Sequence, residues 1–374
     1  MPNSNTEDLQ DYEDEDGHLG DFEKKYKDQM RQIVTQRLDL PISTLPTMLK
    51  EQIKINPDFQ RRDRWDNLRQ SRLIESLIMN VPIPPVFLGE DEYGFYVVLD
   101  GRQRLTAIRD FLNNTLTLKG LEVWGDLNGL TYDDLTKRGL DKHITRRFIS
   151  AIAILKESSP IVKYDVFDRL NTGGVRANDM EVRNAIFRGA FTDNLHALSK
   201  NQNFRKLWDI PLDEIDAEEN GHYQRMDDLS VVLRFFALRN PDDMDSSFRD
   251  YLSDFMVKRN AQYATNPALH SEDKTLFENA ALNCWKIFGA SAFRNTHKKQ
   301  TGPKSAPISD ALMIALSEVD PKILTQDAID RIQNGFHELL SNEEFSKSIS
   351  GGTNGKGAII KRISMAQELV HSSM

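Results

Sequence analysis

The chain has 374 residues, of which 39% are hydrophobic and 28% are charged, and its formal net charge is −9. This length is sufficient for a large core and favours two structural regions. No apolar run approaches the roughly 18 residues of a membrane helix, so the sequence predicts no partner in a membrane. The single cysteine, Cys284, excludes an internal disulfide framework and a cysteine-rich zinc site.

The N-terminal segment is strongly acidic. Residues 1–21 contain eight Asp and Glu residues and no Lys or Arg, so most of the net charge lies there. We expect residues 1–28 to form a disordered, solvated tail; the alternative is a nucleic-acid mimic that covers a basic groove. Because the segment lacks an apolar signal region, we expect a cytoplasmic protein. Helical spacing of apolar residues predicts a helix over 21–37, followed by extended chain over 38–45.

The stretch from Tyr96 to Asn113, YVVLDGRQRLTAIRDFLN, predicts a buried strand, a tight turn at Asp100-Gly101 and an amphipathic helix. Apolar residues in the helix recur three or four positions apart from Leu105 onward, which leaves the charged residues at its start. We expect the preceding strand to pair with residues 86–88 as a hairpin.

A helix start carries unpaired backbone N–H groups and the positive end of the helix dipole, and both favour an anion. Arg102 and Arg104 can add guanidinium groups that match phosphate oxygens, and Asp100 can cap the turn, orient an arginine or hold a hydrated cation. The alternative is an N-cap with surface arginines. The position at the end of a strand favours a phosphate-handling site.

Two other segments combine unusual residues. Phe59-Gln60-Arg61-Arg62-Asp63-Arg64-Trp65 places basic residues between two aromatic residues, which alone indicates core anchors with solvated arginines. The string FDRLNTGGVRANDMEVRNAIFRG, residues 167–189, predicts a glycine turn between two helices, the second with an N-terminal capping box at Asn178.

The C-terminal half has a helical pattern, with helices predicted over 226–238, 248–258, 274–288, 308–317, 327–340 and 359–370. Three segments carry clustered positive charge: 137–147, 294–304 and 351–361. The first has the composition of a basic patch or a solvated helix face. The other two suit contacts to nucleic-acid phosphates or ordinary loops.

Three parts of the sequence resemble motifs of the N-terminal domain of GmrSD-type, modification-dependent restriction endonucleases. They are Asp100 to Arg104, the segment from Phe59 to Trp65 and the string at 167–189, and along the chain they occur in the order expected for that family. That family is a branch of the ParB/sulfiredoxin-like fold. The first motif is similar to DGQQR, with Arg102 in place of the first glutamine. In the second, Phe59 replaces the usual tyrosine. No HNH nuclease pattern accompanies them.

The resemblance implies an α+β fold: a ParB/sulfiredoxin-like nucleotide-binding domain over 29–175 and a mostly α-helical domain over 176–374. It implies a module that binds, and in our interpretation hydrolyses, a nucleoside triphosphate with Mg²⁺ in a DNA-directed, anti-phage defence system. The residues expected to bind the nucleotide are Gln60, Arg61, Gly101, Arg102, Asn171, Thr172 and Gly173, and those expected to act in catalysis are Asp100, Gln103 and Arg104.

The implied partners are modified or foreign DNA, a separate nuclease subunit and further copies of the chain. No residue is predicted to be a direct metal ligand. Two alternatives remain open at this point. One is a catalytically silent DNA-binding or scaffold subunit that recruits a nuclease, and the other is a nuclease that uses the ParB-like pocket itself. Asp100 is the one clear carboxylate of the motif, which is little for two-metal chemistry.

Overall fold

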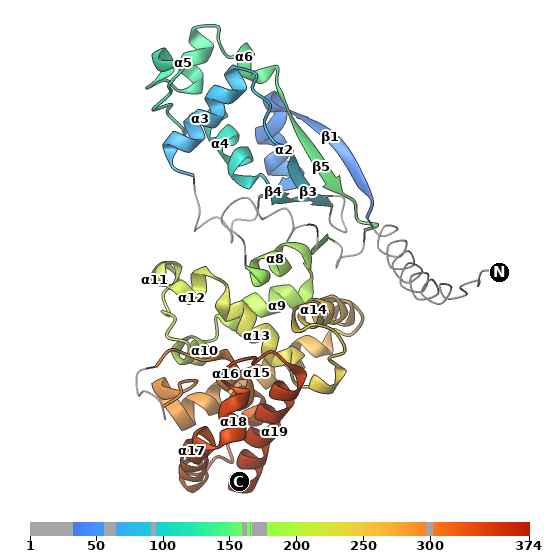
Figure 1. Cartoon of the computed structure of the whole chain (residues 1–374), viewed down its shortest axis with the longest axis vertical. Helices are drawn as coiled ribbons and strands as arrows, with labels where there is room; N and C mark the ends of the chain where they lie inside the picture. The colour runs from blue at the N-terminus through green and yellow to red at the C-terminus, as the bar shows by residue number, and fades with distance from the viewer. Residues whose placement is uncertain are drawn as a thin grey trace, which may run out of the picture. The chain divides into compact units, whose positions relative to one another are not determined.

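The computed structural model describes residues 33–55, 65–90, 95–158, 163–164, 166, 178–296 and 302–374. These residues form two compact units (Figure 1). The first contains the described residues between 33 and 166, and the second contains those from 178 to 374. The first unit holds a sheet with helices and the second is helical, so the predicted α+β class is confirmed.

The described part of the first unit contains a five-stranded mixed sheet in the order β1-β5-β3-β4-β2. Strands β3 and β4 form the predicted hairpin and pair antiparallel, with Phe87 opposite Asp100. Strands β1 and β5 also pair antiparallel, whereas β3 with β5 and β2 with β4 are parallel. The bounds are β1 Thr35–Pro41, β2 Ile53–Lys54, β3 Val86–Glu90, β4 Tyr96–Asp100 and β5 Phe148–Ile154.

Helices pack on one face of this sheet. Figure 1 shows α3 and α4 side by side next to it. Val86, Leu88, Ala151 and Ala153 alternate along β3 and β5 and are buried in the same apolar core as the helices. As predicted, α4 buries residues three or four apart, among them Leu105. The helices are α2 Leu45–Glu51, α3 Asn67–Ile78, α4 Arg102–Leu112, α5 Tyr132–Lys137 and α6 Lys142–Thr145.

The helix predicted over 21–37 is wrong at its C-terminal end, and residues 21–32 lie outside the described part of the chain. Thr35 begins β1, and Arg37 pairs with Ile152 of β5. The apolar spacing in this segment is compatible with a helix, but pairing with a strand more than a hundred residues away determines its conformation. The prediction of extended chain over 38–45 is correct through Pro41 and wrong beyond it, where Ile42–Thr44 form a short 3-10 helix and α2 begins at Leu45.

The second unit consists of packed helices, and the capping box predicted at Asn178 is confirmed. The Asn178 side-chain oxygen accepts hydrogen bonds from the backbone N–H groups of Met180 and Glu181, both at 2.9 Å. The helices are α8 Asp179–Ile186, α9 Ala190–Ser199, α10 Gln202–Leu207, α11 Glu214–Glu219, α12 Gly221–Gln224, α13 Asp227–Ala237, α14 Phe248–Thr265, α15 Ala268–Phe288, α16 Ala306–Leu316, α17 Gln326–Ser341, α18 Glu343–Ser348 and α19 Lys356–Ser373.

A buried ionic cluster joins three of these helices. Asp310 of α16 accepts hydrogen bonds from Arg234 of α13, with an Nε to Oδ1 distance of 2.9 Å, and from Arg362 of α19, with an Nη2 to Oδ2 distance of 2.7 Å. Arg362 also donates to the carbonyl of Thr353 at 2.6 Å. The glycine-rich segment before α19 is therefore folded over a buried arginine.

Candidate functional site

The site begins where β4 ends. Asp100 is the last residue of the strand, Gly101 has a φ of +90°, and α4 begins at Arg102. A side chain at Gly101 would be strained by this φ, and its Cβ would also collide with Val86 of the neighbouring strand, 2.8 Å from the Val86 Cβ. Glycine is thus required both for the left-handed turn and for the close approach of β3.

The first turn of α4 has no side-chain cap. Gly101 has no side chain to accept from the first N–H groups, and the first intrahelical bond runs from the Leu105 N–H to the Gly101 carbonyl at 3.0 Å. The N–H groups of Arg102, Gln103 and Arg104 precede that bond, where a helix presents donors and partial positive charge. The sequence-predicted turn is therefore formed, with the chemistry suited to an oxyanion.

The Arg104 side chain points inward and makes its contacts within the protein. Its side chain is 12% exposed, and its Nη2 lies 2.7 Å from the Asp100 carboxylate. Its Nη1 donates to the carbonyl groups of Pro84 and Pro85. These contacts fasten the proline connector before β3 to the turn, so Arg104 and Asp100 support the geometry of the turn as a pair. Their expected catalytic roles stay predictions.

Gln103 connects the turn to a second predicted motif. Its side-chain oxygen accepts a hydrogen bond from the backbone N–H of Trp65 at 3.2 Å. Trp65 closes the basic segment that contains Gln60 and Arg61, and these two residues lie outside the described part of the chain. Arg102 is partly buried at the first position of α4. The structure thus places Asp100 to Arg104 together.

The third motif is described only in its second half, because Asn171, Thr172 and Gly173 lie outside the described residues. Arg183, in the described half of this motif, is buried in the second unit. Its Nε donates to the Ser253 hydroxyl at 3.1 Å, and its Nη2 donates to the Arg249 carbonyl at 2.9 Å. Arg183 therefore anchors α8 to α14, a role that long-range contacts reveal and local spacing does not.

Two of the basic segments of the C-terminal half are engaged internally. The Lys304 side chain is 1% exposed and donates to the carbonyl of Ala290 at 2.8 Å, and burial lowers its pKa to about 8. Of the two interpretations left open for this segment, the internal contacts of Lys304 favour an ordinary loop over a phosphate contact at this residue. Arg294 pairs with Asp209. In the 351–361 segment, Lys356 donates to the Asp242 carbonyl at 2.7 Å.

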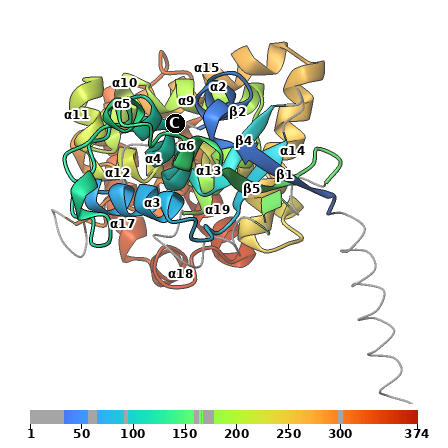
Figure 2. The same cartoon turned by 90° about the horizontal axis from the view of Figure 1, so that it is seen from above.

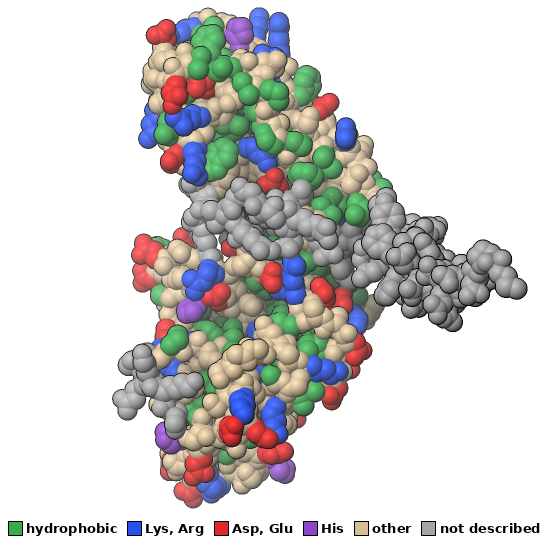
Figure 3. Space-filling model, viewed as in Figure 1, with side chains coloured by type: hydrophobic (Ala, Val, Ile, Leu, Met, Phe, Trp, Pro, Cys, Tyr) green, Lys and Arg blue, Asp and Glu red, His purple; other side chains and the backbone are tan. Residues whose placement is uncertain are grey.

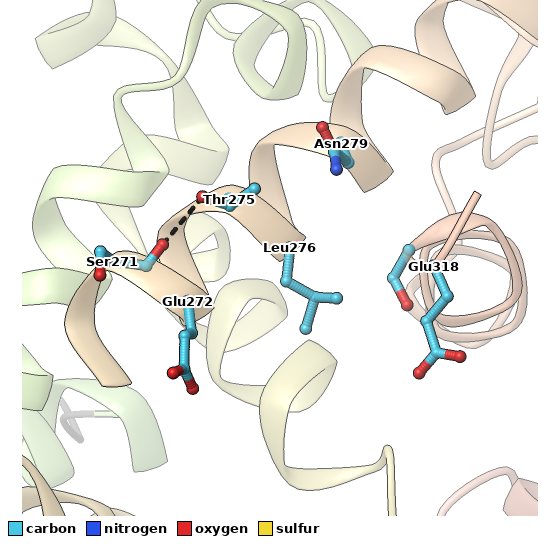
Figure 4. Close-up of a pocket in the computed structure, with 7 residues that line it drawn as sticks. Ser271, Glu272, Thr275, Leu276, Asn279 and Glu318 are labelled. Carbon is cyan, nitrogen blue, oxygen red and sulfur yellow. Dashed lines mark hydrogen bonds between the residues drawn. The ribbon is translucent and has the colours of Figure 1, made fainter. Parts of the chain in front are cut away.

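A separate open pocket of about 550 Å³ lies in the second unit (Figure 4). Its lining includes two carboxylates, those of Glu272 and Glu318, and no basic side chain. Negative charge of this kind repels phosphate, so the pocket does not replace the α4 turn as the candidate anion site. It is lined by Ser271, Glu272, Thr275, Leu276, Asn279, Ser317 and Glu318.

The residues that the structure describes contain no cluster of three His, Cys, Asp or Glu side chains able to hold a metal ion. None of the helices that the structure describes combines the length and the apolar character needed to span a membrane.

The fold and the turn define an α+β domain in which a strand, a left-handed glycine and a helix present an Asp-Gly-Arg-Gln-Arg sequence. Residues 45–188 match the family model of the GmrSD restriction endonuclease N-terminal domain. Residues 45–188 are thus similar to a GmrSD-type N-terminal domain, as the motifs predicted, and a domain of this family implies a component of a restriction-like defence system. No curated protein and no solved structure shows significant similarity to the chain.

Proposed function

We propose that the turn from Asp100 to Arg104 binds the phosphates of a nucleoside triphosphate, and that the chain is the nucleotide-dependent sensor of a DNA-directed restriction system in the cytoplasm. The observation that carries the proposal is the uncapped start of α4, placed at the end of β4 by Gly101. Backbone N–H groups and the helix dipole at such a start favour phosphate, and Arg102 adds a guanidinium group at the same position.

The residues of the turn fit a nucleotide in a specific way. The N–H groups of Arg102, Gln103 and Arg104 would hold phosphate oxygens, and the Arg102 side chain would neutralise their charge. The Oδ2 atom of Asp100 accepts a hydrogen bond from Arg104. Because this oxygen is occupied and the carboxylate is half-buried, Asp100 fits contact with a hydrated Mg²⁺ ion through water rather than direct coordination. When bound, Mg²⁺ would supply further neutralisation of phosphate charge.

Hydrolysis is the finer part of the proposal. The side-chain oxygen of Gln103 accepts a hydrogen bond from the Trp65 backbone N–H. The NH₂ group of Gln103 is therefore the part that would position a water molecule or a phosphate oxygen. Arg104 would act by holding Asp100 and the proline connector in place. Gln60, Arg61, Asn171, Thr172 and Gly173 remain proposed contacts on the strength of the resemblance.

Turnover is the sharpest test. We would measure phosphate release from ATP, GTP and CTP with Mg²⁺, with and without DNA, for the native chain, Arg102→Ala and Arg109→Ala. Arg109 lies in the last turn of the same helix and pairs with Asp110, so it controls for loss of an arginine. We expect Arg102→Ala to lose about a hundredfold in turnover, since it removes charge stabilisation of the transition state, and Arg109→Ala to keep it.

Equal turnover in the two variants would contradict the assignment of the turn. Absence of both turnover and nucleotide binding in the native chain would favour the second candidate, a silent DNA-binding subunit that recruits a separate nuclease. The observation that favours this candidate is that the donors of Arg104 already have internal partners. Metal-dependent cleavage of plasmid DNA by the purified chain would instead support a nuclease.

A further inference from the structure

A second cationic feature of the first unit lies outside the turn, where α5, α6 and the start of β5 meet. Residues 137–147 carry five basic residues against one acidic residue, Asp141. Figure 3 shows Lys and Arg side chains with a His at the upper end of this unit, over α5 and α6, and both helices face the viewer in Figure 2. We call this the α5–β5 surface, formed by Lys137, Arg138, Lys142, Arg146 and Phe148.

The apolar residues of this segment determine which side chains face outward. Leu135 and Ile144 are fully buried and fasten α5 and α6 to the core of the sheet. The Arg147 carbonyl accepts a hydrogen bond from the Ile42 N–H at 3.0 Å, and this bond fixes the chain before β5. The exposed cations therefore project from a backbone that is tied down on both sides.

The positive charge of the surface is largely unneutralised. Lys137 lies 3.6 Å from Asp134, whereas Arg138, Lys142 and Arg146 form no ion pair with any carboxylate of the described residues. Asp134 is itself bonded to the Thr131 N–H at 3.1 Å in a capping box. Arginines elsewhere in this unit, such as Arg104 and Arg109, do have carboxylate partners.

An exposed aromatic side chain follows Arg146 by two residues in the sequence. Phe148 is the first residue of β5, lies opposite Pro41 of β1, and is 61% exposed. Its neighbour Ile149 is buried, so strand alternation directs Phe148 to the outer face of the sheet. A phenylalanine left in water beside arginines offers contact area for a sugar or a base next to cations that suit phosphate.

We infer that the α5–β5 surface binds the backbone of double-stranded DNA, with Arg138, Lys142 and Arg146 on phosphates and Phe148 on the adjoining sugar or base edge. The whole chain carries a net charge of −9 and repels DNA on average, so attraction requires a local surface of opposite sign. This inference rests on the part of the proposed function that names DNA as the partner, and it does not depend on the nucleotide site.

The test is the salt dependence of binding by the full chain to a fluorescent 30-base-pair duplex, without nucleotide. The variant replaces Arg138, Lys142 and Arg146 with Gln, and the control replaces Lys274, Lys322 and Lys347 of the second unit with Gln. Each phosphate contact contributes about 0.9 to the slope of log Kd against log salt concentration. We expect the slope to fall by about 2 to 3 in the variant and to be unchanged in the control.

Phe148→Ser separates the aromatic contact from the charges. It should weaken binding about tenfold, since the apolar contact with the sugar or base edge is lost, while the salt slope stays that of the native chain. All replaced side chains are exposed, and an unchanged Tm confirms that the variants fold.

Equal slopes for the variant, the control and the native chain would overturn the inference, as would tighter binding of an RNA hairpin than of the duplex. Absence of duplex binding by the native chain would overturn it as well. Because no nucleotide is present, these results are independent of the phosphate-release experiment, and either proposal can fail alone.

Discussion

At the scale of single residues, the candidate site depends on Gly101. Its φ of +90° turns the chain from β4 into α4, and its missing side chain lets Val86 approach. The Arg104 side chain also lies close to Gly101, with its Nη2 atom 3.1 Å from the position that a Cβ on residue 101 would take. One glycine therefore determines the orientation of the first N–H groups of α4, which are the donors proposed to bind phosphate.

Gly101→Ala should lower the free energy of unfolding by about 2–4 kcal/mol, because it adds both left-handed backbone strain and overpacking. Urea unfolding followed by circular dichroism would measure the change. Gly125→Ala is the matched control, since a Cβ there meets nothing within 4 Å and its effect should be near zero. Similar losses in the two variants would show that the turn is not constrained as described.

Residue-level roles were predictable only where the partner is close in sequence. The capping box at Asn178 follows from residues three positions apart, and the requirement for glycine after Asp100 follows from the turn. The inward position of Arg104 depends on carbonyl groups twenty residues earlier, and Lys304 is buried against residues from an earlier turn. The sequence alone does not distinguish a basic side chain that binds phosphate from one that binds a carbonyl group of the protein.

At the scale of elements, α3 determines how the chain runs between α4 and α5. Glu75 is buried, and its carboxylate accepts hydrogen bonds from the backbone N–H groups of Val123 at 3.0 Å and Trp124 at 2.8 Å. The Ser71 hydroxyl, one turn earlier on α3, accepts from the Lys119 N–H at 3.0 Å. Two polar side chains thus replace the backbone pairing that an irregular segment lacks.

Glu75→Ala should cost about 1–3 kcal/mol, because the two N–H groups lose their acceptor. Hydrogen exchange should show faster exchange at Val123 and Trp124. Glu75→Gln keeps a carbonyl oxygen and should preserve most of the protection, which distinguishes loss of the acceptor from loss of charge. Unchanged exchange in the alanine variant would mean that other contacts hold the segment.

Local pattern predicted most elements and little of their arrangement. The hairpin of β3 and β4 and helices α4, α13, α16 and α17 match their expected ranges closely, because apolar spacing and turn residues are local signals. Helix α14 continues seven residues beyond its predicted end at 258, and α15 begins six residues before its predicted start at 274. The two-residue β2 and the order of the sheet were not predicted, since pairing between distant strands leaves no mark on either strand alone.

At the scale of the whole molecule, the two units have separate means of stabilisation. The first buries a continuous apolar core beneath its sheet. The second adds the cluster of Arg234, Asp310 and Arg362, in which two guanidinium groups share one carboxylate. Burial lowers the pKa of Arg362, and the Asp310 carboxylate opposes this shift. Such a cluster holds α13, α16 and α19 in fixed positions relative to one another. Removal of any one of its three side chains leaves a buried charge without its partner.

Asp310→Asn should destabilise the second unit by about 3–5 kcal/mol, because it leaves two buried positive charges without a counter-charge. Hydrogen exchange measured by mass spectrometry should show faster exchange in α13, α16 and α19, with β3 and β4 unchanged. Asp330→Asn, in α17 where Gln326 donates to the carboxylate, is a control with little expected effect. Equal acceleration in both units would show that they unfold as one.

The pairing of β1 with β5 has a consequence for the order in which the chain is made. Leu40 lies opposite Ile149, about a hundred residues later, and β5 is the one neighbour of β1 among the described strands. During synthesis β1 therefore leaves the ribosome well before β5, and it stays unpaired while β3, β4 and α4 are synthesised. The glycine turn can form in the nascent chain before the first strand has joined the sheet.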